Sequence, residues 1–220
     1  MHTEAIDISA SYNPSYELAG DLYTWYKIDD HRYGILLLDI MGHGISSSLV
    51  CMFISSVLQD VITRYVSPEL VIAELNRYMN QLNKNGTSLK YYFTAIYLVI
   101  DTESKTIDYV NAGHPPGLLL EEGKPPVRLN LGSCAVGFFD QMEIHQGTLD
   151  YNKDFRLFLY TDGLLEAIEV EGEESEETLL RFLQSIGPEP DVEKIMDELL
   201  PIEIRQQQQD DICMVLIGAK

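Results

Sequence analysis

The helical segments of this chain fall into only two groups, and that order most constrains the fold. One group follows the third predicted strand and the other precedes the last strand, so helices and strands do not alternate regularly. Regular alternation indicates a parallel sheet of βαβ units, whereas separate runs of strands and helices indicate an α+β domain. We therefore expect antiparallel sheets with helices packed against their outer faces.

Apolar alternation and β-branched or aromatic enrichment predict nine or ten strands. They are expected at residues 6–12, 21–28, 33–40, 91–101, 106–111, 117–121, 127–131, 143–149, 155–161 and 212–217, of which 143–149 is weak. The turn at residues 103–105 is typical of a hairpin that joins two of these strands.

Apolar residues at helical spacing predict a long helix at residues 45–66. The apolar residues that recur along it are Ile45, Leu49, Met52, Phe53, Val57, Val61 and Tyr65. Ser67 and Pro68 are typical of the cap and first turn of a second helix, at residues 67–84. Further helices are expected at residues 162–168, 174–186 and 191–200. We expect the apolar stripes to cover a sheet, with a homodimer surface as the alternative.

The composition describes an acidic globular chain. A length of 220 residues fits one domain with a large core, and 15 basic against 35 acidic residues give a net charge of −20. Such a chain repels nucleic-acid phosphates and anionic lipid head groups, so we expect neither partner. No uninterrupted apolar run approaches the ~18 residues of a membrane span, and no signal peptide opens the chain.

Three cysteines, Cys51, Cys134 and Cys213, match no zinc-binding spacing. Cys51 and Cys213 lie in apolar runs and are expected to be buried free thiols, which favours a reducing, cytoplasmic compartment. A strand follows the N-terminus almost at once, so we expect residues 1–220 to be one domain excised from a longer regulatory protein.

Aspartates stand at the ends of several predicted strands. Asp39 and Asp162 end apolar strands, whereas Asp21 opens a strand, and Asp210 and Asp211 open the last one. In antiparallel pairing the end of one strand lies beside the start of its neighbour. We therefore expect these carboxylates to gather on one edge of a sheet.

Clustered carboxylates repel one another and acquire raised pKa values unless a cation lies between them. Mg²⁺ and Mn²⁺ prefer oxygen ligands, and two such ions about 3.5–4 Å apart can activate a water molecule. A single Asp-Gly pair is typical of an ordinary turn, so the prediction of a two-metal site depends on the whole set.

The order of these motifs resembles the metal-dependent phosphatases of the protein phosphatase 2C superfamily. The segments that carry the resemblance are AGDLY (19–23), DIMGHG (39–44), NAGHPPGLLL (111–120), YTDGLLEA (160–167) and DDICMVLI (210–217). They are most similar to the bacterial SpoIIE-like branch, which includes phosphatases of sigma-factor partner switching. The resemblance implies a four-layer αββα sandwich of two antiparallel sheets flanked by helices.

The resemblance also implies roles for single residues. Asp39 would bridge two Mn²⁺ or Mg²⁺ ions, the Ile40 carbonyl would bind one of them, and Asp21 would bind directly or through water. Asp162 and Asp210 would hold the other ion. Water would hydrolyse phosphoserine or phosphothreonine directly, with no covalent phosphoenzyme.

Other motif positions have weaker roles. His43 matches a position proposed as general acid in related enzymes, with a solvent-facing turn residue as the alternative. Asp211 falls where many relatives have Asn, which makes it the less favoured ligand. His114 is expected to hold the turn at residues 111–116. Thr24 replaces a carboxylate that many relatives carry.

The expected substrate is a small phosphorylated anti-anti-sigma-type protein of a bacterial stress or sporulation pathway. The expected regulator is an N-terminal sensor domain that acts on the helices at residues 45–66 and 67–84. A catalytically silent binding module and a hydrolase of small phosphomonoesters are the alternatives.

Overall fold

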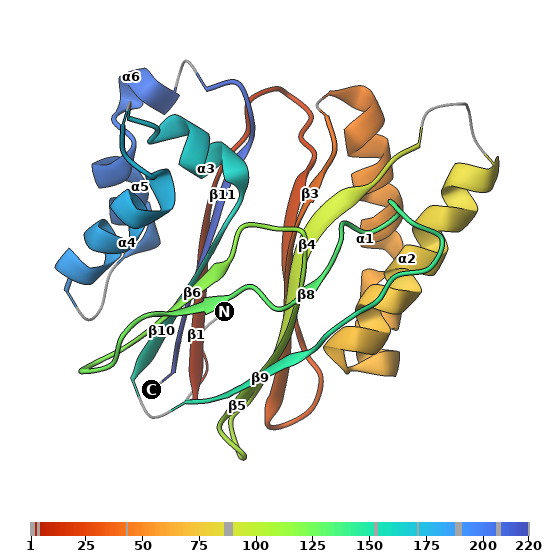
Figure 1. The fold of residues 1–220 in the computed structure, drawn as a ribbon, viewed down its shortest axis with the longest axis horizontal. Helices are drawn as coiled ribbons and strands as arrows, with labels where there is room; N and C mark the ends of the chain where they lie inside the picture. The colour runs from red at the N-terminus through yellow and green to blue at the C-terminus, as the bar shows by residue number, and fades with distance from the viewer. Residues whose placement is uncertain are drawn as a thin grey trace.

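Two sheets lie face to face in the middle of the molecule and helices cover both outer faces (Figure 1). The computed structural model describes residues 3, 5–42, 44–85, 90–151, 154–170, 172–187, 191–205 and 208–219. The first sheet has the order β1 (Ile6–Asn13), β11 (Ile212–Ala219), β10 (Phe155–Tyr160), β6 (Gly117–Glu121) and β7 (Val127–Leu129).

The second sheet has the order β2 (Asp21–Lys27), β3 (Arg32–Ile40), β4 (Phe93–Asp101), β5 (Thr106–Ala112) and β8 (Gly132–Ser133), and β9 (Gly147–Asp150) also pairs with β5. All strand pairs are antiparallel except the short contact of β5 with β8. The predicted fold class is thereby confirmed.

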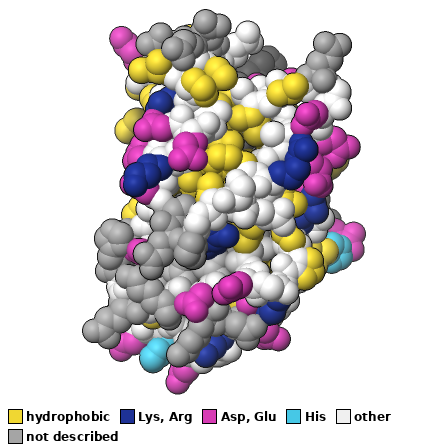
Figure 2. Space-filling view, turned by 90° about the vertical axis from the view of Figure 1, so that its left-hand side faces the viewer, with side chains coloured by type: hydrophobic (Ala, Val, Ile, Leu, Met, Phe, Trp, Pro, Cys, Tyr) yellow, Lys and Arg dark blue, Asp and Glu magenta, His cyan; other side chains and the backbone are white. Residues whose placement is uncertain are grey.

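Helices α1 (Ile45–Tyr65) and α2 (Pro68–Asn85) cover the second sheet. The first sheet is covered by α3 (Asp162–Ala167), α4 (Ser175–Ser185) and α5 (Val192–Leu199), and α6 (Ile202–Arg205) follows them. Figure 2 shows this second helical side, where hydrophobic side chains are interspersed with acidic and basic ones. Arg205 and Asp197 form an ion pair there at 2.7 Å.

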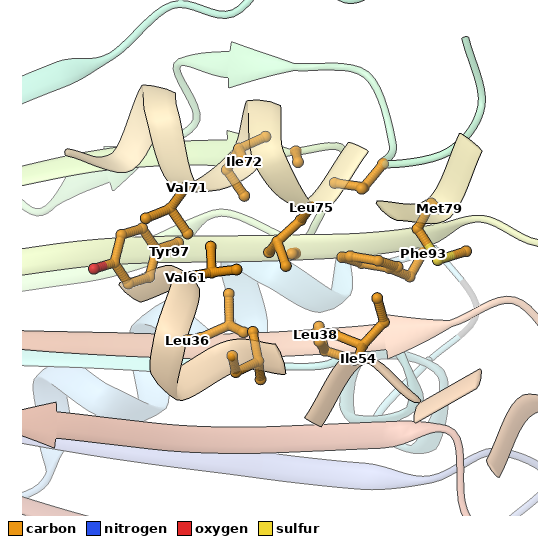
Figure 3. Close-up of a cluster of buried hydrophobic side chains, with 14 of the residues drawn as sticks. Leu36, Leu38, Ile54, Val61, Val71, Ile72, Leu75, Met79, Phe93 and Tyr97 are labelled. Carbon is orange, nitrogen blue, oxygen red and sulfur yellow. The ribbon is translucent and has the colours of Figure 1, made fainter. Parts of the chain in front are cut away.

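Strand β3 explains how one apolar run can serve two cores. Leu36 and Leu38 point outward, toward α1 and α2, where Figure 3 shows them packed against side chains that include Ile54 and Leu75. Ile35 and Leu37 point the other way and join the core between the two sheets. A strand buried on both faces needs apolar residues at every position, as this sequence has.

The orientation predicted for the start of α1 is wrong. Ile45, Leu49 and Met52 were expected on the face that covers the sheet, but their exposed fractions are 69%, 63% and 70%. Ser47, Ser48 and other small or apolar residues of α1 are buried instead, namely Val50, Cys51, Ile54, Leu58, Val61 and Ile62. The small serines let the helix approach the loop before β2, and the Ser48 hydroxyl donates to the Ala19 carbonyl at 2.9 Å.

Helix α1 is also long and apolar enough to cross a membrane by length and composition, contrary to the expectation that no segment would qualify. This is weak support for a membrane span, because a core helix of a soluble protein meets the same criterion. Here α1 buries Ile54, Leu58 and Ile62 against α2 and the second sheet.

Smaller predictions had mixed outcomes. The second helix begins at Pro68, and the hairpin around Ser104 joins β4 to β5, as expected. The weak strand expected at residues 143–149 is instead β9, at Gly147–Asp150, because only this part pairs with β5. Cys51 and Cys213 are buried free thiols, as expected.

Two substitutions in α1 test its orientation. Ile54→Ala removes a fully buried side chain and should lower the free energy of unfolding by about 2–5 kcal/mol. Leu49→Ala truncates an exposed side chain of the same helix and should change it by less than about 0.5 kcal/mol. Urea denaturation of both variants measures the difference. A larger loss for Leu49→Ala than for Ile54→Ala would show that α1 packs by the stripe that the sequence favours.

Candidate metal centre

Asp21 and Asp39 face each other across two neighbouring strands. They are directly paired in the antiparallel register of β2 and β3, at the end of both strands. Since Ile35 and Leu37 point between the two sheets, Asp39 at the next alternate position points there as well. The first carboxylate pair therefore closes one end of the core between the sheets, and Asp21 is 7% exposed.

The second pair comes from the opposite sheet. Asp162 is the first residue of α3, directly after β10, and Asp210 precedes β11. Gly163 brings them together, because a side chain there would place its Cβ 2.2 Å from the Asp211 carbonyl oxygen and 3.4 Å from the Asp210 Cβ. Only glycine permits this close backbone approach.

The expectation that all four carboxylates gather on one edge of a sheet is therefore wrong in part. Asp21 and Asp39 lie at the end of one sheet, whereas Asp162 and Asp210 lie at the end of the other. The two sheets stack, so the pairs meet at one end of the sandwich. Thr161, which is 1% exposed, lies at this end of the first sheet, where its hydroxyl donates to the Asp211 carbonyl at 3.4 Å and accepts from the Cys213 amide at 3.0 Å.

The carboxylates influence one another strongly. Burial raises the pKa of Asp21, and the charge of Asp39 raises it further. Burial likewise raises the pKa of Asp39, to which the charges of Asp162 and Asp210 add. The pKa of Asp162 is raised by burial and by Asp210, while the Gly163 amide opposes the rise. These shifts are those expected of carboxyl groups that are buried and lie close to other carboxyl groups.

Asp211 has a structural function. Its carboxylate is 4% exposed and accepts from the Ser15 amide at 2.8 Å, the Ser15 hydroxyl at 2.9 Å and the Gly20 amide at 2.8 Å. These bonds fix the loop that leads into Asp21. Both Asp211 oxygens are thereby engaged, and its place as the less favoured ligand stays a prediction.

The remaining predicted site residues are placed as follows. The Ile40 carbonyl oxygen would lie 3.1 Å from a Cβ at Gly20, so it stands at the loop before Asp21. His43 lies outside the described residues. The His114 amide donates to the Asn111 side chain at 2.8 Å, which holds the turn as expected, and burial lowers the pKa of its imidazole to about 3.

Sequence reasoning assigned no function to Glu166 or Thr94. Glu166 follows Asp162 by one turn of α3, and burial together with Asp162 and Asp210 raises its pKa. Thr94 is paired with Asp39 across β3 and β4, and its hydroxyl contacts the His114 Nδ1 at 2.8 Å. The i, i+4 spacing of Asp162 and Glu166 was the available signal for the first of them.

The donor set has the chemistry that a hard divalent cation requires. Oδ2 of Asp21 is buried and finds no hydrogen-bond partner among the described residues, so one oxygen is left for another ligand. Carboxylate and carbonyl oxygens suit Mg²⁺ and Mn²⁺. In their present conformations, however, no three His, Cys, Asp or Glu side chains of the described ranges are grouped as a cation would need. The residues fit such ions by chemistry and by pairing, and closure around an ion requires side-chain rotation.

The metal-free protein should lose stability as the pH rises. A carboxyl whose pKa is higher in the folded than in the unfolded state opposes folding increasingly above the unfolded-state pKa of about 3.9. Asp21→Asn removes one such carboxyl. In a chelator, the free energy of unfolding of this variant should therefore fall less steeply between about pH 5 and pH 8 than that of the original chain, as urea denaturation at each pH measures.

The matched control for this experiment is Asp60→Asn. Asp60 lies exposed on α1, so its replacement should leave the pH slope unchanged. Identical slopes for Asp21→Asn and the original chain would show that the Asp21 carboxyl does not lower the free energy of unfolding as the pH rises.

Comparison with known proteins identifies the family. Residues 29–220 match the model of the SpoIIE family, Stage II sporulation protein E. The phosphoserine phosphatase RsbP of Bacillus subtilis (strain 168) is 39% identical over 221 residues, which covers 99% of this chain and 53% of RsbP. The chain thus spans about half the length of this curated relative.

Solved structures share the fold. The PP2C phosphatase domain of SpoIIE from Bacillus subtilis, solved with a fragment of its regulatory domain, has a TM-score of 0.81 at 16% identity, covering 99% of this chain and 63% of that one. RsbX in complex with magnesium has a TM-score of 0.73 at 20% identity, covering 100% and 98%. With a family model that matches most of its length, this chain belongs to the SpoIIE family.

Proposed function

We propose that this chain is a metal-dependent phosphatase that hydrolyses phosphoserine or phosphothreonine on a protein. The observation that carries the proposal is the meeting of two carboxylate pairs, Asp21–Asp39 and Asp162–Asp210, at one end of the sandwich. A site that only binds has no need to bury and crowd negative charge. The similarity to RsbP, a phosphoserine phosphatase, supports the same activity here.

The carboxylates would hold two Mn²⁺ or Mg²⁺ ions. The residues that would hold them are Asp21, Asp39, Asp162, Asp210 and the Ile40 carbonyl. Bound there, such ions neutralise phosphoryl oxygens and lower the pKa of a water molecule. The magnesium bound in the structure of RsbX, a protein of the same fold, supports this choice of ion.

The reaction requires positioning more than covalent chemistry from the protein. Water forms a bond to phosphorus, the bond between phosphorus and the serine oxygen breaks, and the serine oxygen takes a proton. The Asp211 carboxylate holds the loop that leads into Asp21 in place for this step. We assign His43 as the general acid that supplies the proton, which remains a prediction from its motif.

Substitution of two aspartates tests the proposal. Phosphate release from a phosphoserine protein with Mn²⁺ should cease in a chelator, and Asp39→Ala and Asp162→Ala should each reduce it at least about 100-fold, since each removes a charged ligand. The exposed Asp60→Ala should retain the original rate. Activity that survives both site substitutions would exclude this centre as the catalytic one.

Two alternatives give other outcomes in the same assay. A catalytically silent binding module would be folded and release no phosphate at any metal concentration. A hydrolase of small phosphomonoesters would turn over free phosphoserine at least as efficiently as a phosphoprotein.

The proposed substrate is a small phosphorylated anti-anti-sigma-type protein in the cytoplasm, within a stress or sporulation pathway. The similarity to RsbP and the fold of SpoIIE support a partner-switching role. Because the chain covers 53% of RsbP, we also propose that the parent protein carries a regulatory segment outside residues 1–220.

We further propose that this regulatory segment acts on α1. Ile45, Leu49 and Met52 form an exposed apolar stripe on α1. The stripe begins at the first residue of the helix, directly after Gly44, which ends the motif at residues 39–44. Covering this stripe would move α1 relative to Ala19, to which Ser48 bonds.

A charged side chain in this stripe should remove the effect of the regulatory segment on the phosphatase rate. In the longer protein, Leu49→Glu should abolish the difference in phosphatase rate between the regulated and unregulated states, while the isolated chain keeps its own rate. The control is the same substitution, Leu70→Glu, at a leucine that is exposed on α2. A Leu49→Glu protein that still responds to its regulator would contradict the assignment of the stripe.

A further inference from the structure

An aromatic cluster is exposed beside the proposed metal centre. Phe138 and Phe139 are 50% and 53% exposed, and their ring centroids are 4.9 Å apart with the rings nearly perpendicular. Tyr92 packs edge-to-face on Phe138 at 5.3 Å. We call these three residues the aromatic platform. Exposed rings that contact one another form a contiguous apolar surface, which is typical of a binding site.

The platform adjoins the carboxylates through the strand order. Asp39 is paired with Thr94, and the Met41 amide donates to the Tyr92 carbonyl at 3.1 Å. Tyr92 precedes Thr94 by two residues, a distance of about 7 Å along a strand. A protein chain whose phosphoserine reaches Asp39 therefore passes within reach of the platform.

Helix α2 holds the segment that carries the two phenylalanines. The Asn76 side chain accepts from the Gly137 amide at 2.7 Å, and Asn80 Nδ2 donates to the Phe139 carbonyl at 3.2 Å. These asparagines are one helical turn apart and only 6% and 9% exposed. Buried side-chain amides that bond to the backbone of a loop fix the position of that loop.

A third asparagine holds the strand side of the platform. Asn83 donates to the Tyr91 carbonyl at 2.8 Å and accepts from the Tyr91 amide at 2.9 Å. Gly137, at a φ of +87°, lets its segment lie close to Tyr91, because a Cβ at this position would lie 2.9 Å from the Tyr91 carbonyl oxygen. The rings are thus held before any partner arrives, which lowers the entropic cost of binding.

The charge of the chain indicates what the platform contacts. At −20, the protein repels the phosphate group and any acidic flank of a substrate at long range, and the platform itself offers uncharged rings for short-range contacts. Aromatic rings supply such contacts to aliphatic and aromatic side chains. An apolar stretch beside the phosphoserine fits this surface, whereas a strongly acidic one does not.

We propose that Tyr92, Phe138 and Phe139 are specificity-determining residues that dock apolar side chains flanking the phosphoserine of the protein substrate. Asn76, Asn80 and Asn83 are their positioning residues on α2. This inference rests on the proposed phosphatase function and adds the part of the substrate that is recognised.

Three substrates test the inference: a phosphoserine peptide with leucine and isoleucine flanks, one with glutamate flanks, and free phosphoserine. In the Phe138→Ala/Phe139→Ala chain with Mn²⁺, KM for the apolar peptide should rise about tenfold, at least fivefold more than KM for free phosphoserine. The original chain should favour the apolar over the acidic peptide, and the double variant should lose that preference. Leu70→Ala, exposed to 51% on α2, should behave as the original chain does.

Asn80→Asp tests the support of the platform separately, because a carboxylate cannot donate to the Phe139 carbonyl. KM for the apolar peptide should rise while kcat changes by less than about twofold. A loss in kcat alone, for all substrates, would indicate a general defect and would contradict a positioning role.

The experiment distinguishes a failure of the proposed phosphatase function from a failure of the docking inference. If the original chain releases phosphate from none of the substrates, the phosphatase function fails and the docking inference falls with it. If the original chain is active and the double variant has the same KM values, only the docking inference fails. A chain that sediments as a dimer, with a monomeric double variant of unchanged KM, would show that the platform joins two copies of the protein.

Discussion

The stacking of the two sheets holds together carboxylates that repel one another. Asp21 and Asp39 come from one sheet and Asp162 from the other, and burial raises the pKa of all three. The large apolar core between the sheets, which includes Leu37 and Val215, supplies the favourable free energy against which this repulsion acts. A rigid scaffold of this kind keeps the carboxylate pairs at one end of the sandwich, so that side-chain rotation is enough to close the proposed site around a cation.

The sequence allowed half of the site to be derived by simple geometry. Antiparallel pairing places the start of β2 beside the end of β3, and the register pairs Asp21 with Asp39 as this rule requires. The same rule says nothing about which sheet faces which. The meeting of Asp39 with Asp162 depends on the stacking of two sheets, and the expectation of one shared edge was wrong for that reason.

The orientation of α1 could not be derived from apolar spacing, because apolar residues surround much of this helix. The choice between two faces was decided by close approach: Ser47 and Ser48 are buried against the loop at Ala19, while Leu49 faces solvent. Small polar residues carry little weight in a hydrophobic pattern. The asparagines of α2 were overlooked for the same reason, since Asn76 and Asn80 are polar residues that the fold buries.

The two features that the hydrophobic pattern missed lie on either side of the carboxylates and touch the same helical layer. Ser48 ties α1 to the loop before Asp21, and Asn80 ties α2 to the segment that carries Phe139. A displacement of this helical pair would therefore reach the proposed metal ligands through one contact and the aromatic platform through the other. Buried hydrogen bonds of this kind are short-range and either made or broken. If the proposed metal centre, docking surface and regulatory contact are correct, one movement of the helical layer would control both cation binding and substrate docking.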